Sequence, residues 1–380
     1  MGDLLVVNAG SSSIKLMLFR DGAPMLSGAV TEIGGAAELV LGPLRRSVQA
    51  ADHLGAIALC LAALEELGHP ASGLQAAAHR VVHGGRRLVA PCRVTPEVEA
   101  EIAACIPLAP LHNPHNLAAI RALRAVAPDL PQFASFDTAF HASNPEEALR
   151  YALPPGHEEI RRYGFHGISY AGLVEQLPAI SGAPLPERLL ALHLGNGASL
   201  CAIRGGQSVA TTMGYSPLDG LTMGTRSGSI DGNAVLRLAE LHGIDGAARV
   251  LNRESGLLGL GGASDMRALQ AAGTEAAEFA IRHFRYWVLR HAGSMIAAMQ
   301  GLDAVAFTGG IGENDIQLRR QILEGLNWAG AGVEVEGAGP RGPRLHAEGS
   351  RVAAWIVPAR EEARIAAEAR HILTEATRTA

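Results

Sequence analysis

Short apolar runs alternate along the chain with segments whose apolar residues recur at helical spacing. Residues 4–7 predict a strand, the Asn, Gly and Ser residues at 8–13 predict a turn, and residues 14–19 predict a returning strand. Residues 189–203 repeat this form: an apolar strand, a turn rich in Gly, Asn and Ser, and a second apolar strand. The two hairpins lie about half a chain apart, which indicates an internal duplication.

The rest of the pattern predicts an α/β protein, because strands alternate with helices and several strands end in glycines. Further strands are expected at 133–136, 304–308 and 352–357. Helices are expected at 54–67, at 95–106 with Thr95 as N-cap, at 113–127, at 274–300 (long and mostly buried), from about 315, and at 361–372. We place a domain boundary near 143–145 and a surface loop at 337–343.

Size and charge narrow the class of protein. A single hydrophobic core stops growing at roughly 250–300 residues, so 380 residues predict two domains. The net charge of −5 argues against nucleic acid as a partner but allows one small anionic ligand. The four cysteines form no C-x-x-C pair, which favours scattered buried thiols in a reducing cytosol. The longest apolar stretch, 57–64, is far shorter than the ~20 residues of a membrane span, so we expect a cytoplasmic protein.

Three glycine-rich turns follow predicted strands, at 8–13, 195–199 and 309–314. Small residues let backbone N–H groups approach phosphate oxygens closely. Each turn alone also suits an ordinary hairpin, but three in one chain favour a nucleoside triphosphate ligand. None matches G-x-x-x-x-G-K-[ST], and none matches G-x-G-x-x-G at the first strand, which excludes a P-loop enzyme and disfavours a dinucleotide oxidoreductase.

Several charged residues accompany these turns. Arg80 precedes paired glycines and Arg226 lies within Gly224–Gly228; we interpret both as loop arginines that clamp a carboxylate or phosphoryl group, with a surface arginine as the plain alternative. Asp137 follows directly at the end of a predicted strand. Its side chain is equally well interpreted as a metal-linked acid or as the N-cap of the next turn. Asn8 and Glu361 are further candidates for the surroundings of a metal.

The histidines and the bulky apolar residues divide between structural and functional interpretations. The fifteen histidines show no zinc spacing, and His112 and His115 are expected to pack and cap the start of a helix. His166 lies between glycines and could donate a hydrogen bond to a phosphoryl oxygen in the transition state. Met213, Met223 and the aromatic run 279–287 are expected in the core.

Nine stretches together resemble the acetate kinase family, within the superfamily of sugar kinases, actin and heat-shock ATPases. They are VVNAGSSSIK (6–15), HRVVHGG (79–85), APLHNPHN (109–116), FDTAFH (136–141), YGFHGIS (163–169), LHLGNGAS (192–199), MGYSPLDGLTMGTRSGSID (213–231), SGLLGLGGASDMR (255–267) and FTGGIGEN (307–314). They occur in order over nearly the whole chain, and as a set they are highly specific.

The resemblance implies a fold and a site. It implies two actin-like, ribonuclease-H-like domains with an active-site cleft between them: residues 1–145 with 361–380, and a nucleotide-binding domain of residues 146–360. Arg80 and Arg226 would grip the carboxylate and the moving phosphoryl group, Asp137 would be the essential acid, and His166 would stabilise the transition state. Asn8 and Glu361 would lie near Mg²⁺, with Mn²⁺ as an alternative. The pocket for the acyl methyl group would be lined by Val82, Leu111, Phe165 and Pro217. ATP would be bound by Lys15, His193, Leu194, Gly195, Asn196, Gly197, Asp265, Met266, Arg267, Gly310, Ile311, Gly312, Glu313 and Asn314.

The implied reaction is transfer of a phosphoryl group from ATP to acetate, giving acetyl phosphate and ADP, in a homodimer. A carboxylate is already a nucleophile, so the protein's task is in-line positioning and charge neutralisation rather than proton abstraction. This sequence departs from the family pattern at Arg360, where a neutral amide is usual, at Gly232, where proline is usual, and at Tyr170, where histidine is common.

Two alternatives stay open. A propionate- or butyrate-preferring kinase is disfavoured by Val82, which narrows the expected pocket, although one methylene changes discrimination by only ~1–3 kcal/mol. The other alternative is an ATP-driven switch or filament protein on the same scaffold. It would not need the paired arginines, and it would show no acetate-dependent turnover.

Overall fold

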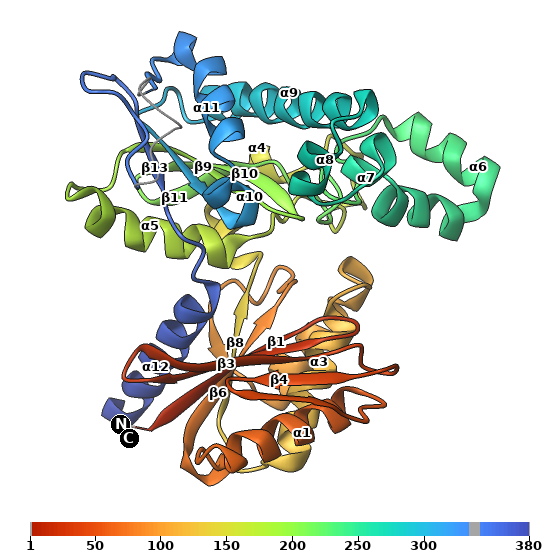
Figure 1. Ribbon diagram of the computed structural model, residues 1–380, viewed down its shortest axis with the longest axis vertical. Coiled ribbons are helices and arrows are strands. Elements are labelled where there is room, and N and C mark those ends of the chain that lie inside the picture. The colour runs from red at the N-terminus through yellow and green to blue at the C-terminus, as the bar shows by residue number, and fades with distance from the viewer. Residues whose placement is uncertain (1, 334–342, 380) are drawn as a thin grey trace. The chain divides into compact units, whose positions relative to one another are not determined.

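The computed structural model describes residues 2–333 and 343–379 of the chain. The expected surface loop at 337–343 lies outside the described residues except for its last residue. The chain divides into two compact units: unit 1 comprises Met1–Phe140 and Arg360–Ala380, and unit 2 comprises His141–Ala359. Each unit contains its own sheet, so the α/β class predicted from the sequence is confirmed (Figure 1).

Unit 1 is built on an eight-stranded sheet of order β5-β4-β3-β2-β1-β6-β8-β7. Its central strands β1, β6 and β8 run parallel, while β2 and β3 extend the sheet antiparallel to β1. Parallel central strands are covered on both faces, and β1 is accordingly almost wholly buried. The strands are β1 (Asp3–Ala9), β2 (Ile14–Arg20), β3 (Ala23–Thr31), β4 (Glu38–Leu41), β5 (Leu44–Ser47), β6 (Leu74–Val81), β7 (Cys92–Arg93) and β8 (Gln132–Phe136).

Helices cover the two faces of this sheet (Figure 1). On one face α1 (His53–Glu66) and α3 (Asn113–Val126) pack against each other, and their apolar side chains share a core with β1 and β2. On the other face α12 (Glu361–Thr379) packs against β1, β6 and β8. The short helix α2 (Pro96–Ala104) begins at Thr95, whose hydroxyl accepts a hydrogen bond from the backbone N–H of Val98, so the predicted N-cap is confirmed.

Unit 2 repeats the central topology of unit 1 with a five-stranded sheet of order β11-β10-β9-β12-β13. Here β9, β12 and β13 run parallel, and β10 and β11 extend the sheet antiparallel to β9, as β2 and β3 do beside β1. Both predicted hairpins are confirmed, and the repeat of strand order supports the internal duplication. The strands are β9 (Arg188–Leu194), β10 (Ala198–Arg204), β11 (Gln207–Thr211), β12 (Ala304–Thr308) and β13 (Ala353–Ile356).

The helices of unit 2 flank its sheet and extend beyond it. α9 (Glu275–Ala298) packs on β9, β10 and β11, and α5 (Gly167–Ser181) packs against β9 from the other face (Figure 1). The remaining helices are α4 (Glu146–Leu149), α6 (Gly232–Arg249), α7 (Gly256–Gly261), α8 (Met266–Ala272), α10 (Gly309–Asn314) and α11 (Ile316–Gly325). Of the eighteen residues of α6, only Ala247 is buried.

Several expectations for these elements were wrong. The predicted glycine turn at 309–314 is the helix α10, because glycines at a strand end can enter a helix directly. Helix α9 buries only one stripe of its surface, since Phe279 is 47% exposed and Tyr286 is 61% exposed. The other residues expected in the core, Met213 and Met223, are fully buried. Arg80 lies in β6 and not in a loop. Of the four cysteines, Cys92 is only half-buried and the other three are buried.

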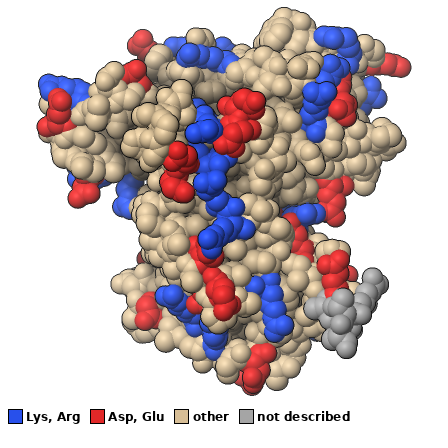
Figure 2. Space-filling view, turned by 180° about the vertical axis from the view of Figure 1, so that it is seen from behind, with Lys and Arg blue, Asp and Glu red and all other residues tan. Residues whose placement is uncertain are grey.

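Acidic and basic side chains are interspersed on the surface. On the face shown in Figure 2, acidic and basic side chains lie close together in several places. Several ion pairs join neighbours on one helix, such as Arg320 with Glu324. Such exposed pairs contribute little to stability. Within residues 2–333 and 343–379, no helix is long and apolar enough to cross a membrane.

Candidate active site

Three polar side chains of unit 1 lie at the carboxyl ends of neighbouring parallel strands. Val7 of β1 pairs with His79 of β6, which places Asn8 beside Arg80. Val81 of β6 pairs with Phe136 of β8, and Asp137 follows directly. Carboxyl ends of parallel strands are the usual place for binding sites in α/β sheets. The sheet register therefore brings together Asn8, Arg80 and Asp137, which the sequence predicted separately.

Arg80 holds two carboxylates. Its Nη2 donates to Oδ2 of Asp137 at 2.6 Å, and its Nε donates to Oδ1 at 3.1 Å. The side chain of Asp137 in this two-pronged pair is only 2% exposed. Nε of Arg80 also lies 3.8 Å from Oε2 of Glu361, the first residue of α12. Burial would lower the pKa of the Arg80 guanidinium, but the charges of Asp137 and Glu361 outweigh burial and raise that pKa above its ordinary value.

Two asparagines brace the backbone that follows Arg80. Oδ1 of Asn116 accepts from the N–H of Val82 at 3.1 Å, and its Nδ2 donates to the carbonyl oxygen of Ala9 at 2.8 Å. Asn113 accepts from the N–H of His83 and donates back to the carbonyl oxygen of the same residue. Both asparagines start α3, so the motif at 109–116 ties this helix to the ends of β1 and β6. Sequence reasoning did not find this role.

The first glycine-rich turn joins β1 to β2. The N–H of Gly10 donates to the carbonyl oxygen of Ser13 at 2.8 Å, and Nε2 of His53 lies 2.8 Å from the carbonyl oxygen of Gly10. The ring of His53 stacks on that of His115, which confirms the packing expected for His115 at a helix start. Lys15 lies opposite Asn8 in the β1–β2 ladder, with its side chain exposed. The turn thus presents a cation and an amide at the end of β1.

Two histidines of unit 2 stack on each other beside the second glycine-rich turn. The rings of His166 and His193 lie 4.1 Å apart between centroids, with an interplanar angle of 21°. His166 precedes α5 with φ +59°, a left-handed conformation that costs energy in a residue other than glycine. A Cβ added to Gly197 would lie 3.2 Å from Nε2 of His166, and one added to Gly309 would lie 3.2 Å from Nε2 of His193. Both Nε2 atoms therefore face glycine backbones.

Arg226 lies in the loop between β11 and α6, as the sequence predicted. Its Nη1 donates to the carbonyl oxygen of Pro217 at 3.2 Å, and it would lie 3.9 Å from a Cβ added to Gly197. The N–H of Gly224 in the same loop donates to the carbonyl oxygen of Asn196 at 2.9 Å. This loop is therefore joined to the turn at 195–197, and it places an arginine beside His166.

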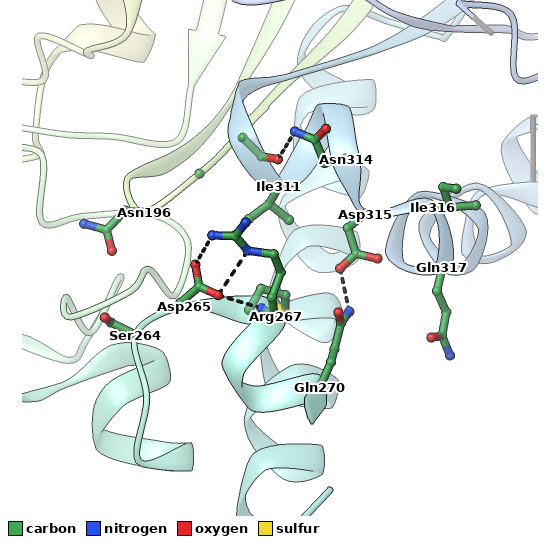
Figure 3. Close-up of a pocket in the computed structure, with 13 residues that line it drawn as sticks. Asn196, Ser264, Asp265, Arg267, Gln270, Ile311, Asn314, Asp315, Ile316 and Gln317 are labelled. Atoms are coloured by element: carbon green, nitrogen blue, oxygen red, sulfur yellow. Dashed lines mark hydrogen bonds and ion pairs between the residues drawn. The ribbon is translucent and has the colours of Figure 1, made fainter. Parts of the chain in front are cut away.

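A pocket of about 670 Å³ opens next to this turn. Figure 3 shows its wall of side chains from the start of α8 and from α10 and α11: Arg267 pairs with Asp265, and Gln270 donates to Asp315 at 2.7 Å. Gly195 of the turn and Gly310 of α10, which have no side chains, complete one side. A volume of this size suits a nucleotide-sized ligand.

The lining overlaps the predicted ATP residues without matching them. It contains eight of them: Gly195, Asn196, Asp265, Met266, Arg267, Gly310, Ile311 and Asn314. Glu313 lies elsewhere, and its carboxylate accepts from the backbone N–H groups of Gly309 and Ala359. Leu194 is fully buried. Sequence reasoning missed five lining residues, Ser264, Gln270, Asp315, Ile316 and Gln317. Ser264 directly precedes a predicted residue and the other four follow one, and the helical spacing of Gln270 after Met266 was the available signal.

The metal expected near Asn8 and Glu361 would have few protein ligands. In the described part of the chain, no group of three or more His, Cys, Asp or Glu side chains is arranged to hold an ion. Two carboxylates do flank Arg80, with an asparagine amide at the neighbouring strand end. Mg²⁺ in phosphoryl-transfer enzymes keeps several waters and takes one or two carboxylates plus substrate phosphates, so this oxygen-only set fits Mg²⁺.

Comparisons with known proteins agree with this geometry. The sequence matches the Acetokinase family over residues 3–367. It is 42% identical to an acetate kinase of Rhodopseudomonas palustris, aligned over 97% of each chain. The crystal structure of an acetate kinase from Porphyromonas gingivalis superposes with a TM-score of 0.91 at 34% identity, covering 98% of this chain and 100% of that one. A propionate kinase from Francisella tularensis gives a TM-score of 0.92 at 34% identity, covering 97% and 99%.

The fold and these likenesses first define a class: an actin-like α/β protein of two domains whose second unit contains a nucleotide-sized pocket. Because the family match covers nearly the whole chain, the particular assignment follows. The chain belongs to the Acetokinase family, and it is an enzyme.

Proposed function

We propose that this protein is a phosphotransferase that uses ATP to phosphorylate the carboxylate of acetate, giving acetyl phosphate and ADP reversibly. The observation that supports this most directly is the pair of polar clusters: Arg80 with its carboxylates in unit 1, and His166 with Arg226 beside a glycine turn in unit 2. Family membership supplies the class of reaction.

In this proposal ATP occupies the pocket of unit 2. The base and ribose lie among the residues of α8, α10 and α11, and the phosphates extend toward the turn at 195–197, where glycines allow close approach of the backbone. Lys15 contributes a further cation at the end of β1. The side chains of Gln270 and Asp315 hold each other by a hydrogen bond and so offer a fixed polar edge.

The chemical step needs positioning and charge neutralisation. The acetate carboxylate attacks the terminal phosphorus directly, and negative charge spreads over the equatorial oxygens as the bond to ADP breaks. Arg80, already fixed by its two-pronged contact with Asp137, orients the carboxylate. Arg226 and His166 donate to the phosphoryl oxygens in the transition state, where such contacts are most effective. Val82, Leu111, Phe165 and Pro217 would surround the methyl group.

Mg²⁺ is the cofactor we propose, with Mn²⁺ as a substitute, and Asn8, Asp137 and Glu361 are the residues that would hold it directly or through waters. When bound, such an ion neutralises phosphate charge. Arg80 lies between the two carboxylates, so it keeps them fixed and limits their mutual repulsion. Asp137 is therefore assigned to organising charge and not to removing a proton.

A hydroxylamine-trap assay tests the proposal, because hydroxylamine converts an acyl phosphate into a hydroxamate, which gives a coloured complex with ferric ion. Purified protein receives Mg-ATP with acetate, propionate or butyrate in parallel, and Arg226→Ala serves as the inactive comparison. We expect hydroxamate from acetate above all. ATP hydrolysis that does not depend on any of the three acids would favour the switch-protein alternative. More hydroxamate from propionate than from acetate would instead indicate a propionate kinase.

We also propose that the protein is a cytoplasmic homodimer joined through unit 2. The helix α6 exposes Leu236, Leu241 and Ile244, the last by 82%. Beside its start a groove of about 400 Å³ is lined by Ile230, Leu260 and Trp287 among others. A two-fold axis requires a self-complementary surface, and exposed apolar side chains of a helix beside a groove that contains Ile230, Leu260 and Trp287 can form such a surface.

The dimer is tested by light scattering after size-exclusion chromatography. Ile244→Lys places a charge at the most exposed apolar position and should give a monomer of half the mass. Met25→Lys, at an exposed position of β3 in unit 1, is the matched control and should stay dimeric. A wild-type monomer at micromolar concentration would contradict the proposal.

A further inference from the structure

A chain of three side chains, joined by two contacts, leads from the interior of unit 2 to His166. Nδ1 of His166 lies 2.9 Å from Oγ of Ser199, and the hydroxyl of Tyr170 lies 2.5 Å from the same Oγ. Ser199 and Tyr170 are both fully buried, one in β10 and the other in the first turns of α5. His166 directly precedes α5, so its backbone is fixed at the start of the helix that contains Tyr170.

The direction of these hydrogen bonds follows from the acidity of the two hydroxyls. A phenol, with a pKa of about 10, gives up its proton far more readily than the alkyl hydroxyl of serine, so the hydroxyl of Tyr170 is the donor of this pair. Its own proton then points to Oγ of Ser199, the hydroxyl at 2.5 Å. Ser199 in turn uses its single proton toward Nδ1 of His166. A ring nitrogen that accepts a hydrogen bond carries no proton, so the proton of a neutral His166 lies on Nε2.

Nε2 is the atom that faces the glycine turn, within 3.2 Å of a Cβ added to Gly197. The stacked ring of His193 is held in a parallel way, with its Nδ1 at 2.9 Å from Oγ of Ser169, the residue next to Tyr170. Two successive residues of α5 thus each act on one imidazole, Ser169 directly on His193 and Tyr170 through Ser199 on His166. Both rings turn Nε2 toward the glycines at 197 and 309.

We propose that Tyr170 and Ser199 are positioning residues, a hydroxyl relay that keeps His166 in the tautomer with its proton on Nε2, ready to donate to the transferring phosphoryl group. The donation to the phosphoryl group rests on the role of His166 in the proposed function, whereas the tautomer rests only on the hydrogen bonds within unit 2. Without the relay, Nδ1 could carry the proton and Nε2 would present a lone pair to phosphate oxygens, a repulsive contact at the moment when charge develops.

Nitrogen-15 NMR of the ligand-free protein tests the relay. Long-range ring couplings distinguish the two tautomers, and the His166→Gln spectrum identifies the signals. Wild type should show the Nε2–H pattern, and Ser199→Ala and Tyr170→Phe should show a mixed or reversed pattern. Tyr170→Phe keeps the buried ring and so should fold. Ser208→Ala is the matched control, since it removes an equally buried hydroxyl that contacts His141 instead.

Kinetics then tests the consequence. The two relay variants should lower kcat about tenfold with little change in KM for acetate or ATP, because the lost interaction belongs to the transition state. Ser208→Ala should keep wild-type kcat. An Nε2–H pattern that persists in both folded relay variants would overturn the relay, even with the proposed function intact. A changed tautomer with unchanged kcat would overturn its link to catalysis.

Discussion

Arg80 combines a role in the proposed reaction with a structural one, since its partner Asp137 is only 2% exposed. Arg80→Ala is predicted to lower kcat/KM by about 10²–10⁴-fold through loss of charge neutralisation. It should also lower the free energy of unfolding by about 3 kcal/mol, because a buried carboxylate loses its partner. Steady-state kinetics and urea unfolding measure the two effects separately.

The comparison for Arg80 is Arg45→Ala, which removes an exposed arginine paired with Glu38 in unit 1. Neither activity nor stability should change there. Arg80→Lys keeps a charge but not the two-pronged contact, so it should recover stability more than activity. Near-wild-type turnover in Arg80→Ala would remove this residue from the site.

Single residues were predicted from the sequence only where their type and neighbours were unusual. Arg80 before two glycines and His166 between glycines met this condition, and the structure places each in a polar cluster. Asn113 and Asn116 did not, because their work is to bond backbone atoms of residues 30 to 107 positions away. No local pattern reports a partner at such separation. The relay through Ser199 escaped notice for the same reason.

Gly309 shows how one glycine allows a strand to pass directly into a helix, here β12 into α10. Gly309 has φ +79°, and an added Cβ would lie 2.8 Å from the carbonyl oxygen of Leu194. Gly309→Ala is therefore predicted to destabilise the protein by about 2 kcal/mol and to weaken ATP binding, since β12 and α10 would separate from β9. Urea unfolding and nucleotide titration provide the readouts.

The neighbouring glycine is the matched control for this substitution. A Cβ on Gly310 would meet no atom within 4 Å, and its φ is not in the left-handed region. Gly310→Ala should therefore leave stability unchanged. It should still weaken ATP binding if the nucleotide occupies the pocket that Gly310 lines. Equal stability losses in both variants would show that the backbone of Gly309 is not the constraint.

Elements with strong local signals were predicted well and others were not. Apolar runs predicted β8 and β12, and N-cap residues such as Thr95 predicted the start of α2. Glycine content usually marks turns, so the sequence predicts a turn at 309–314, whereas in the structure a strand end and the start of α10 meet at Gly309. The burial of α9 was overestimated because its aromatic residues occur on more than one face.

At the scale of the molecule, the duplicated hairpin was visible in the sequence but the matching sheets were not. Order β3-β2-β1-β6-β8 in unit 1 corresponds to β11-β10-β9-β12-β13 in unit 2. The strands that complete each sheet come from distant segments with different sequences, and only pairing shows their equivalence. Each unit consequently offers parallel strand ends at which polar side chains gather.

Buried histidines in both units predict how the whole molecule responds to acid. Burial lowers the pKa of His79 and His83 in unit 1, and of His141 in unit 2, to about 4 in each case. In the unfolded chain the same groups have a pKa near 6.5, so between about pH 6.5 and 4 the unfolded state binds more protons. Stability is therefore fully present above pH 6.5 and falls by about 1 kcal/mol per pH unit for each histidine down to pH 4.

Urea unfolding at half-unit steps from pH 7 to pH 4.5 measures this slope, and one substitution assigns part of it. His79→Gln keeps a hydrogen-bonding group beside Gln132, to which Nε2 of His79 lies at 2.7 Å, but removes the titrating ring. The slope of its unfolding free energy should be smaller by about 1 kcal/mol per pH unit. His371→Gln, whose side chain is 73% exposed, should keep the wild-type slope. Equal slopes in all three proteins would mean that His79 takes up its proton without unfolding, and acid sensitivity would then have to come from His83 and His141.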